Sequence, residues 1–170
     1  MLVLWIVLSV LAALVLVLFV GGSMIQKEHS ATCTIEVPAP PEQVFTAITD
    51  WKSLMTWNKQ VTAVSELPGG GGWVETMGSM TIPLRVEKSE ASRLLVVRIA
   101  DEGLPFGGTW THRLERTSQG TKLVSTEDGF IKPAPFRFIA HFFLGYHKTL
   151  TDYQKALAVK FGSQAQPVNS

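Results

Sequence analysis

The sequence SATCTIEVPAPPEQVF, residues 30–45, carries the pattern that decides the fold. Its first half alternates apolar and polar side chains, as in a strand that is buried on one side. The apolar face carries Ala31, Cys33, Ile35 and Val37. Prolines at 38, 40 and 41 end this strand, and Pro41 suits the first position of a helix, where the missing N–H is not needed. The stretch therefore predicts a strand, Ser30–Val37, followed directly by a helix.

Downstream of this stretch the spacing of apolar residues changes twice. A second short helix is expected through Trp51 and Leu54. From Phe136 to Phe161 apolar side chains recur every three or four residues, which predicts one long amphipathic helix. Gly162 ends it, and the polar tail 163–170 is expected to be disordered. Between these helices the spacing is two, which predicts the strands Val61–Leu67, Trp73–Met77, Met80–Lys88, Leu94–Asp101, Thr109–Arg116 and Thr121–Asp128.

The N-terminal segment has the composition of a membrane-spanning helix. Residues 2–20 carry no charged side chain and as a helix would be about 28 Å long, close to the thickness of a bilayer core. A cleaved signal peptide is the alternative, but no basic residue precedes the run, which is also longer than the usual apolar region of a signal. We expect residues 1–25 to form a single-pass anchor and short linker. Lys27, partly offset by Glu28, slightly favours a cytoplasmic domain.

The order of the predicted elements defines an architecture. One strand, two short helices, about six further strands and a C-terminal helix indicate an α+β domain with a curved antiparallel sheet of about seven strands wrapped on the long helix. A helix cannot fill the concave side of a strongly curved sheet. We therefore expect a gap lined by side chains, where an apolar small molecule would bind.

Three separated blocks resemble the START-like superfamily, also described as SRPBCC, polyketide cyclase/dehydrase-like or helix-grip proteins. They are residues 35–45 with Asp50 and Trp57, GTWTHRLE at 108–115, and GTKL at 120–123 with TEDG at 126–129. The resemblance covers roughly Ala31 to Gly162 and implies a helix-grip domain over residues 26–162. The superfamily includes lipid carriers, plant binders of hydrophobic ligands and aromatase/cyclases, so the resemblance implies a pocket and not one particular reaction.

The candidate pocket residues are Trp57, Trp110, His112, Phe143, Tyr146, Leu150 and Tyr153. On its predicted strand His112 shares a face with Trp110 and Leu114, which places it toward the gap. The alternative for His112 is a hydrogen-bonded core or edge histidine. Tyr146 and Tyr153 combine an apolar ring with a hydroxyl group that can orient a ligand bearing one polar group.

Composition and spacing argue against several other kinds of site. With 15 Lys and Arg against 14 Asp and Glu and no basic block, nucleic acid is not an expected partner. Cys33 is the only cysteine, so neither an intramolecular disulfide nor a thiolate zinc site can form. His141 and His147 lie about 240° apart around a helix and make no metal pair. Adjacent residues Glu127 and Asp128 point to opposite faces of a strand, so a carboxylate pair would need another residue. We expect no metal and no cofactor, and assign no catalytic residue.

Three hypotheses for function follow. The leading one is a membrane-anchored domain whose cavity binds a lipid or other hydrophobic small molecule. The second is an enzyme of the polyketide cyclase/dehydrase kind, in which His112 or a pocket tyrosine acts as acid or base. The third is a membrane-tethered interaction domain whose pocket is filled by its own aromatic side chains. The ligand and the oligomeric state are not specified by the sequence.

Overall fold

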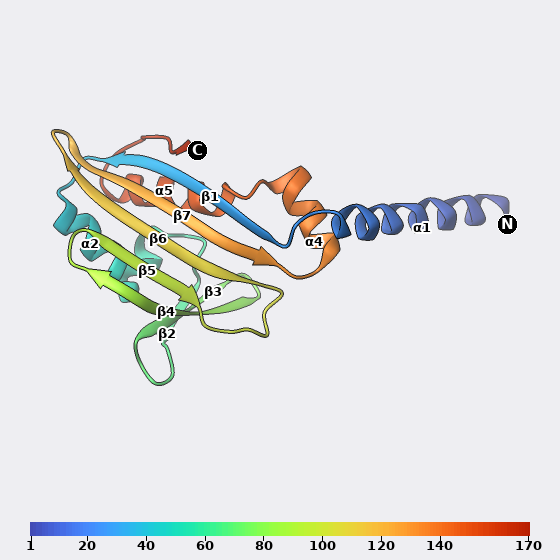
Figure 1. Ribbon diagram of the computed structural model, residues 1–170, viewed down its shortest axis with the longest axis horizontal. Helices are drawn as coiled ribbons and strands as arrows, with labels where there is room; N and C mark the ends of the chain where they lie inside the picture. Colours follow the sequence, from blue (N-terminus) through green and yellow to red (C-terminus); the bar gives the residue numbers. More distant parts are fainter.

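Eight antiparallel strands form one curled sheet in the computed structural model, which describes residues 1–170 (Figure 1). The order across the sheet is β2-β3-β4-β5-β6-β7-β1-β8, so that β1 is inserted between β7 and the C-terminal strand. The strands are β1 Glu28–Val37, β2 Ala63–Glu66, β3 Gly72–Met77, β4 Met80–Glu90, β5 Leu94–Ile99, β6 Phe106–Thr117, β7 Gly120–Ile131 and β8 Val168–Asn169. This is the α+β, helix-grip arrangement that the sequence predicts.

The helices lie at the two ends of the sheet and across its inner face. Helices α2 Pro41–Thr49 and α3 Leu54–Trp57, with the 3-10 turn η1 Trp51–Ser53 between them, follow β1. Helix α4 Ala134–Ile139 and the π-helical turn η2 Ala140–Leu144 precede α5 Lys148–Lys160. The N-terminal helix α1 Leu2–Ser23 projects from the opposite end of the domain to α2, and α4 lies at its base (Figure 1).

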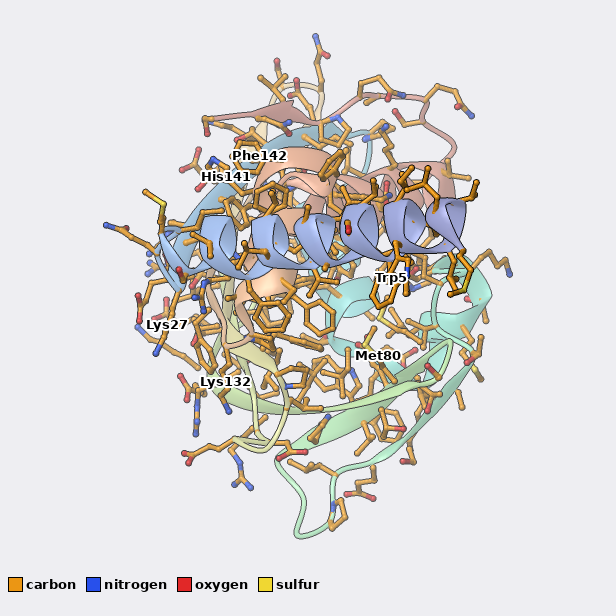
Figure 2. All side chains as sticks on the ribbon, turned by 90° about the vertical axis from the view of Figure 1, so that its right-hand side faces the viewer. Trp5, Lys27, Met80, Lys132, His141 and Phe142 are labelled. Carbon is orange, nitrogen blue, oxygen red and sulfur yellow. The ribbon has the colours of Figure 1, made fainter.

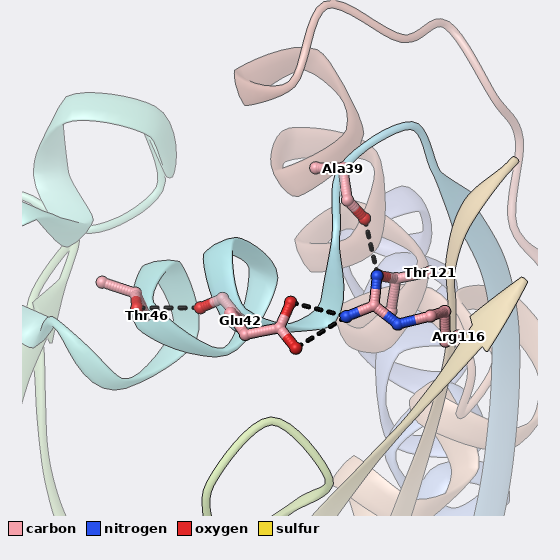
Figure 3. Close-up of polar contacts among 5 residues, drawn as sticks. All are labelled: Ala39, Glu42, Thr46, Arg116 and Thr121. Atoms are coloured by element: carbon pink, nitrogen blue, oxygen red, sulfur yellow. Dashed lines mark hydrogen bonds and ion pairs between the residues drawn. The ribbon is translucent and has the colours of Figure 1, made fainter.

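Helix α2 is fixed to the β6–β7 hairpin by polar contacts (Figure 3). The Nη2 group of Arg116 donates to both carboxylate oxygens of Glu42, at 2.7 and 2.8 Å. The hydroxyl group of Thr121 donates to the carbonyl oxygen of Ala39 at 2.6 Å, and Thr46 caps the Glu42 carbonyl oxygen at 2.8 Å. The Arg116–Glu42 and Thr121–Ala39 bonds join residues 74 and 82 positions apart in sequence, so they close this end of the domain.

The main core lies between the inner face of the sheet, α2 and the C-terminal part of α5. Val37, Leu123 and Leu157 are fully buried there, and Val44 joins them from α2. Burying such a side chain stabilises the fold by about 1.5–3 kcal/mol. The core occupies the α2 end of the sheet and leaves the α1 end of the inner face to the site described below.

The C-terminal helix differs from the sequence prediction. The prediction of one continuous helix from Phe136 to Phe161 is wrong at its middle, because η2 ends at Leu144 and α5 begins only at Lys148. Gly145 makes the break with φ 74° and ψ 144°, a conformation that costs other residues strain. The break lets α4 pack on α1 while α5 packs on β1.

The C-terminal tail, expected to be disordered, instead returns to the sheet. Strand β8 pairs with β1 through Thr34 opposite Val168 and Cys33 opposite Asn169. The Cys33 thiol also donates to the side-chain oxygen of Asn169 at 3.2 Å. The sequence could not predict this strand, because two residues are too few to show an alternation of apolar and polar side chains.

Candidate functional site

A cavity of about 700 Å³ lies between the concave face of the sheet and the segment from α4 to α5. Of the 34 residues that line it, 21 are hydrophobic. Its volume and lining are those of a site for a small organic ligand. The third hypothesis required aromatic side chains to fill this space, and they do not. Strands β4 to β6 contribute a continuous part of the apolar wall: Ile82, Leu84, Leu95, Val97, Ile99 and Phe106.

The residues that both line the cavity and face outward mark its opening. Phe136 of α4 and Leu144 of η2 are each more than half exposed and line one side, whereas Met80, the first residue of β4, lines the other. Figure 2 views this end of the domain, with Phe142 above α1 and Met80 below it. The opening therefore lies at the end of the domain from which α1 emerges.

His112 occupies the inner wall of the cavity. Its side chain is 2% exposed, and its Nδ1 atom lies 2.8 Å from the Ser125 hydroxyl oxygen. Its ring stacks on that of Tyr153, with centroids 5.4 Å apart, and meets the edge of Trp110 at 5.9 Å. The two interpretations of His112 therefore describe the same side chain, because it is a hydrogen-bonded core histidine that also lines the cavity.

Burial in the cavity wall disfavours the charged forms of its titratable groups. Burial lowers the pKa of His112 to about 4, so that the imidazole is neutral at pH 7. Burial also raises the pKa of the Glu75 carboxyl group, although the indole N–H of Trp73 donates to it at 2.7 Å and acts in the other direction. The pKa of Tyr153 is raised by burial and, secondarily, by the nearby Glu75 carboxylate.

A second polar group lies nearer the opening, where His29 of β1 and Glu127 of β7 face each other. His29 Nε2 is 3.5 Å from Glu127 Oε1, and the His29 ring stacks on Tyr146 with centroids 4.3 Å apart. Gly129, directly across from His29 in the sheet, leaves room for the ring, since a Cβ atom there would lie 2.9 Å from it. The pair was not predicted, because it joins residues 98 positions apart.

Four of the seven predicted pocket residues line the cavity, namely Trp110, His112, Tyr146 and Tyr153. Leu150 is fully buried against β1, and Trp57 packs against the edge of Tyr153 from behind, at 5.4 Å between centroids. Phe143 points outward and is 74% exposed. Whether any of the seven contacts a ligand stays a prediction.

Sequence reasoning did not assign five titratable residues to the wall: His29, Glu75, Glu127, Lys148 and Asp152. The signal for Glu127 was present, because alternation along β7 puts it on the same face as the buried Ser125. Lys148 is the only lysine or arginine of the lining, and its ammonium group is paired with Asp152 at 2.6 Å. The lining thus offers no unpaired cation to an anionic ligand.

A curled antiparallel sheet closed by a C-terminal helix around an apolar cavity defines the helix-grip class of small-molecule binding domains. The chain belongs to the family described as polyketide cyclase / dehydrase and lipid transport, whose model matches residues 28–158. The match begins at the first residue of β1 and leaves out α1. Membership of this family makes binding of a hydrophobic molecule or a cyclase-like role the two functions to weigh.

Solved structures share the fold at low sequence identity. A START superfamily protein from Mycobacterium smegmatis is 15% identical, with a TM-score of 0.60 over 81% of this chain and 98% of that one. A conserved protein from Geobacillus kaustophilus is also 15% identical, with a TM-score of 0.67 over 82% and 99%. The di-domain ARO/CYC StfQ from the steffimycin biosynthetic pathway is 12% identical, with a TM-score of 0.61 over 79% of this chain and 51% of that one. Comparison with curated proteins finds no significant match.

Proposed function

We propose that this protein is a membrane-anchored binding domain that takes a lipid or other hydrophobic small molecule into its internal cavity at the bilayer surface. The observation that carries the proposal is the apolar cavity of about 700 Å³. An unfilled apolar space of this size sacrifices packing contacts, a loss that a bound apolar molecule would make good. The family description, which includes lipid transport, supports the same function.

Helix α1 supplies the anchor in this proposal. It has 22 residues, a mean hydropathy of 3.2 in its most apolar window and none of that window buried against the domain. A signal sequence near the N-terminus has the same composition. The junction favours an anchor, because Arg137 of α4 donates from Nε to the carbonyl oxygen of Gly22 at 2.9 Å and is buried in doing so. A leader that is removed would have no need of this contact.

The segment from α4 to η2 would then lie in the membrane interface beside α1. Phe136, Phe142, Phe143 and Leu144 are all more than half exposed there, a cost in water that the lipid would remove. Two of them, Phe136 and Leu144, also line the cavity opening. Lys27 and Lys132 lie together below the base of α1 (Figure 2), and by the positive-inside tendency we place the domain on the cytoplasmic side.

Native mass spectrometry of the full chain, released from detergent micelles, tests the proposal together with lipid extraction. We expect a bound apolar species that the variant Ile99→Trp, which places an indole in the cavity, loses without unfolding. Val124→Trp, on the outer face of β7, is the matched control and should keep the species. A protein that is empty and also takes up nothing from a panel of lipids would contradict the proposal.

The alternative is a cyclase- or dehydrase-like enzyme that uses the same cavity. Glu75 is the observation in its favour, because a buried carboxyl group with a raised pKa is suited to general acid catalysis near neutral pH. Glu75→Gln would then abolish turnover of a polyketide-like substrate and leave its binding intact. If the protein only binds its ligand, neither the unmodified protein nor the Glu75→Gln variant turns the substrate over.

A further inference from the structure

The hydrogen bonds around Ser125 define which nitrogen of His112 carries the proton. Gln154 is fully buried, and its side-chain nitrogen donates to the Cys33 carbonyl oxygen at 2.9 Å and to the Ser125 hydroxyl oxygen at 3.0 Å. The Cys33 carbonyl oxygen can only accept, which fixes the orientation of the Gln154 amide group. Ser125 therefore receives one hydrogen bond and has its own proton still to donate.

His112 Nδ1 is the only other polar atom within hydrogen-bond distance of the Ser125 hydroxyl group. If Nδ1 carried a proton, the Ser125 proton would be buried without an acceptor, an arrangement that folded proteins avoid. Ser125 must then donate to Nδ1, and the proton of the neutral imidazole is on Nε2.

The Nε2–H group of His112 meets the cavity. It has no hydrogen-bond partner within the protein. Unlike His29 Nδ1 and Trp57 Nε1, which are also unpartnered, it is not fully enclosed by protein atoms. The same is true of the Tyr153 hydroxyl group, whose ring stacks on that of His112. Two donors on adjacent rings therefore face the cavity without acceptors.

The surroundings select a neutral acceptor over an anionic one. Glu75 and Glu127 both line the cavity, and the single lysine of the lining is held by Asp152. A carboxylate or phosphate buried in this wall would have no cation to pair with, which costs several kcal/mol in a medium of low polarity. A carbonyl oxygen has two lone pairs and no charge, and so matches two donors.

We propose that the Nε2–H group of His112 and the hydroxyl group of Tyr153 together bind the carbonyl oxygen of a neutral apolar ligand, a ketone or an ester. The proposal rests on the proposed function, because it names the polar group of the molecule that the cavity takes. His112 lies six residues, or about 20 Å, along β6 from Phe106 at the opening end. The carbonyl group enters first, and the apolar remainder lies along β5 and β6.

Binding of three matched probes to the full chain in lipid nanodiscs tests the proposal: 2-dodecanone, dodecane and dodecanoate. We expect 2-dodecanone to bind about tenfold more tightly than dodecane, which corresponds to one or two net hydrogen bonds, and dodecanoate to bind least. His112→Phe and Tyr153→Phe should each remove most of the preference for the ketone. Thr111→Val, which removes a hydroxyl group from the face of β6 that points away from the cavity, should retain it.

The double variant His112→Phe/Ser125→Ala guards against misfolding, because it removes the hydroxyl group that the single variant would leave unpaired. Equal binding of ketone and hydrocarbon by the unmodified protein would overturn this proposal and leave the proposed function standing. Binding of none of the three probes would overturn both.

The tautomer itself is measurable without any ligand. Two-bond ¹H–¹⁵N correlation spectra of the full chain, labelled at histidine and recorded at pH 7, should show His112 protonated on Nε2. A proton on Nδ1 would overturn the proposal whatever the binding experiments show, since the cavity would then meet an acceptor in place of a donor.

Discussion

His112 and Glu75 are both buried titratable residues of the cavity wall, and burial moves their pKa values in opposite directions. In each case burial disfavours the charged form, and for His112 the imidazole is neutral at pH 7. The same shifts also connect the cavity to the stability of the fold.

His112 predicts a loss of stability in acid. Its pKa is 6.5 when exposed and about 4 in the folded protein, so between these values the unfolded chain takes up a proton that the folded chain refuses. The stabilisation is complete above pH 6.5 and falls by about 3 kcal/mol as the pH falls through 4. Urea unfolding followed by tryptophan fluorescence should show this, and the double variant His112→Phe/Ser125→Ala should lack it.

The raised pKa of Glu75 acts in the opposite direction, because the folded chain holds its proton to higher pH than the unfolded chain does. The comparison of the double variant with the unmodified protein cancels this contribution, since Glu75 is present in both. Identical pH profiles for the two proteins would show that His112 is not buried as described.

At the residue scale the sequence predicted which face of the sheet a side chain lies on, but not which residues it contacts. Alternation along β6 placed His112 with Trp110 and Leu114, and the structure has all three on the inner face. The partners Ser125 and Gln154 could not be predicted, because they come from β7 and α5 and are joined to His112 only once the sheet has curled. His29 was missed for the same reason.

At the scale of elements, apolar residues at every second position predicted the strands. Apolar residues at every third or fourth position predicted a helix but not the break in it. The apolar stripe continues from Ile139 through Tyr146 to Phe161 and conceals Gly145, whose helix penalty of about 1 kcal/mol was outweighed by the stripe. What decides the break is tertiary. Helix α4 packs on α1, and α5 packs on β1, and no straight helix does both.

Gly145→Ala distinguishes the broken helix from a continuous one by the sign of its effect. No atom lies within 4 Å of the position of the added Cβ, so the change is purely one of backbone conformation. With φ at 74° we expect a destabilisation of about 1–3 kcal/mol in urea unfolding. In a continuous helix the same substitution would instead stabilise by about 1 kcal/mol, and that result would contradict the break.

Arg137 predicts how firmly the anchor is held. Besides Gly22 it donates to the carbonyl oxygens of Ile131 and Lys132, at 3.3 and 2.5 Å. Arg137→Leu removes the donor that joins these three carbonyl oxygens, at a cost of about 2 kcal/mol to the junction. The distance distribution between spin labels at Ser9→Cys and Ser118→Cys should broaden, while the exposed Arg93→Leu leaves it unchanged. Cys33 is buried and stays unlabelled. A distribution equally narrow in Arg137→Leu would mean that other contacts hold α1.

At the scale of the whole molecule, α1 and α4 lie at one end of the domain and α2 lies at the other (Figure 1). The exposed residues Phe136 of α4 and Leu144 of η2 line the cavity opening at the α1 end. The sequence predicted the apolar N-terminal helix and the cavity, but neither the opening nor the exposed aromatic side chains beside it. Their alignment could not be predicted, because it depends on the break at Gly145 and on the contact of Arg137 with Gly22. In the proposed function, a cavity that opens beside α1 would take its ligand directly from the bilayer that α1 spans.

This arrangement predicts uptake from the protein's own membrane and not from others. In vesicles that hold the full chain and a brominated long-chain ketone too insoluble to cross water, Trp73 and Trp110 on the cavity wall should be quenched quickly. The same ketone supplied in separate vesicles should quench slowly, because the tether prevents the domain from reaching them.

The double variant Phe142→Asp/Phe143→Asp puts charge into the proposed interface and should slow uptake about tenfold, which corresponds to an increase of about 1.4 kcal/mol in the barrier. Val168→Asp, an equally exposed apolar position on β8, should not slow it. Equal rates from both kinds of vesicle would mean that the ligand arrives through water and that the anchor serves only to localise the domain.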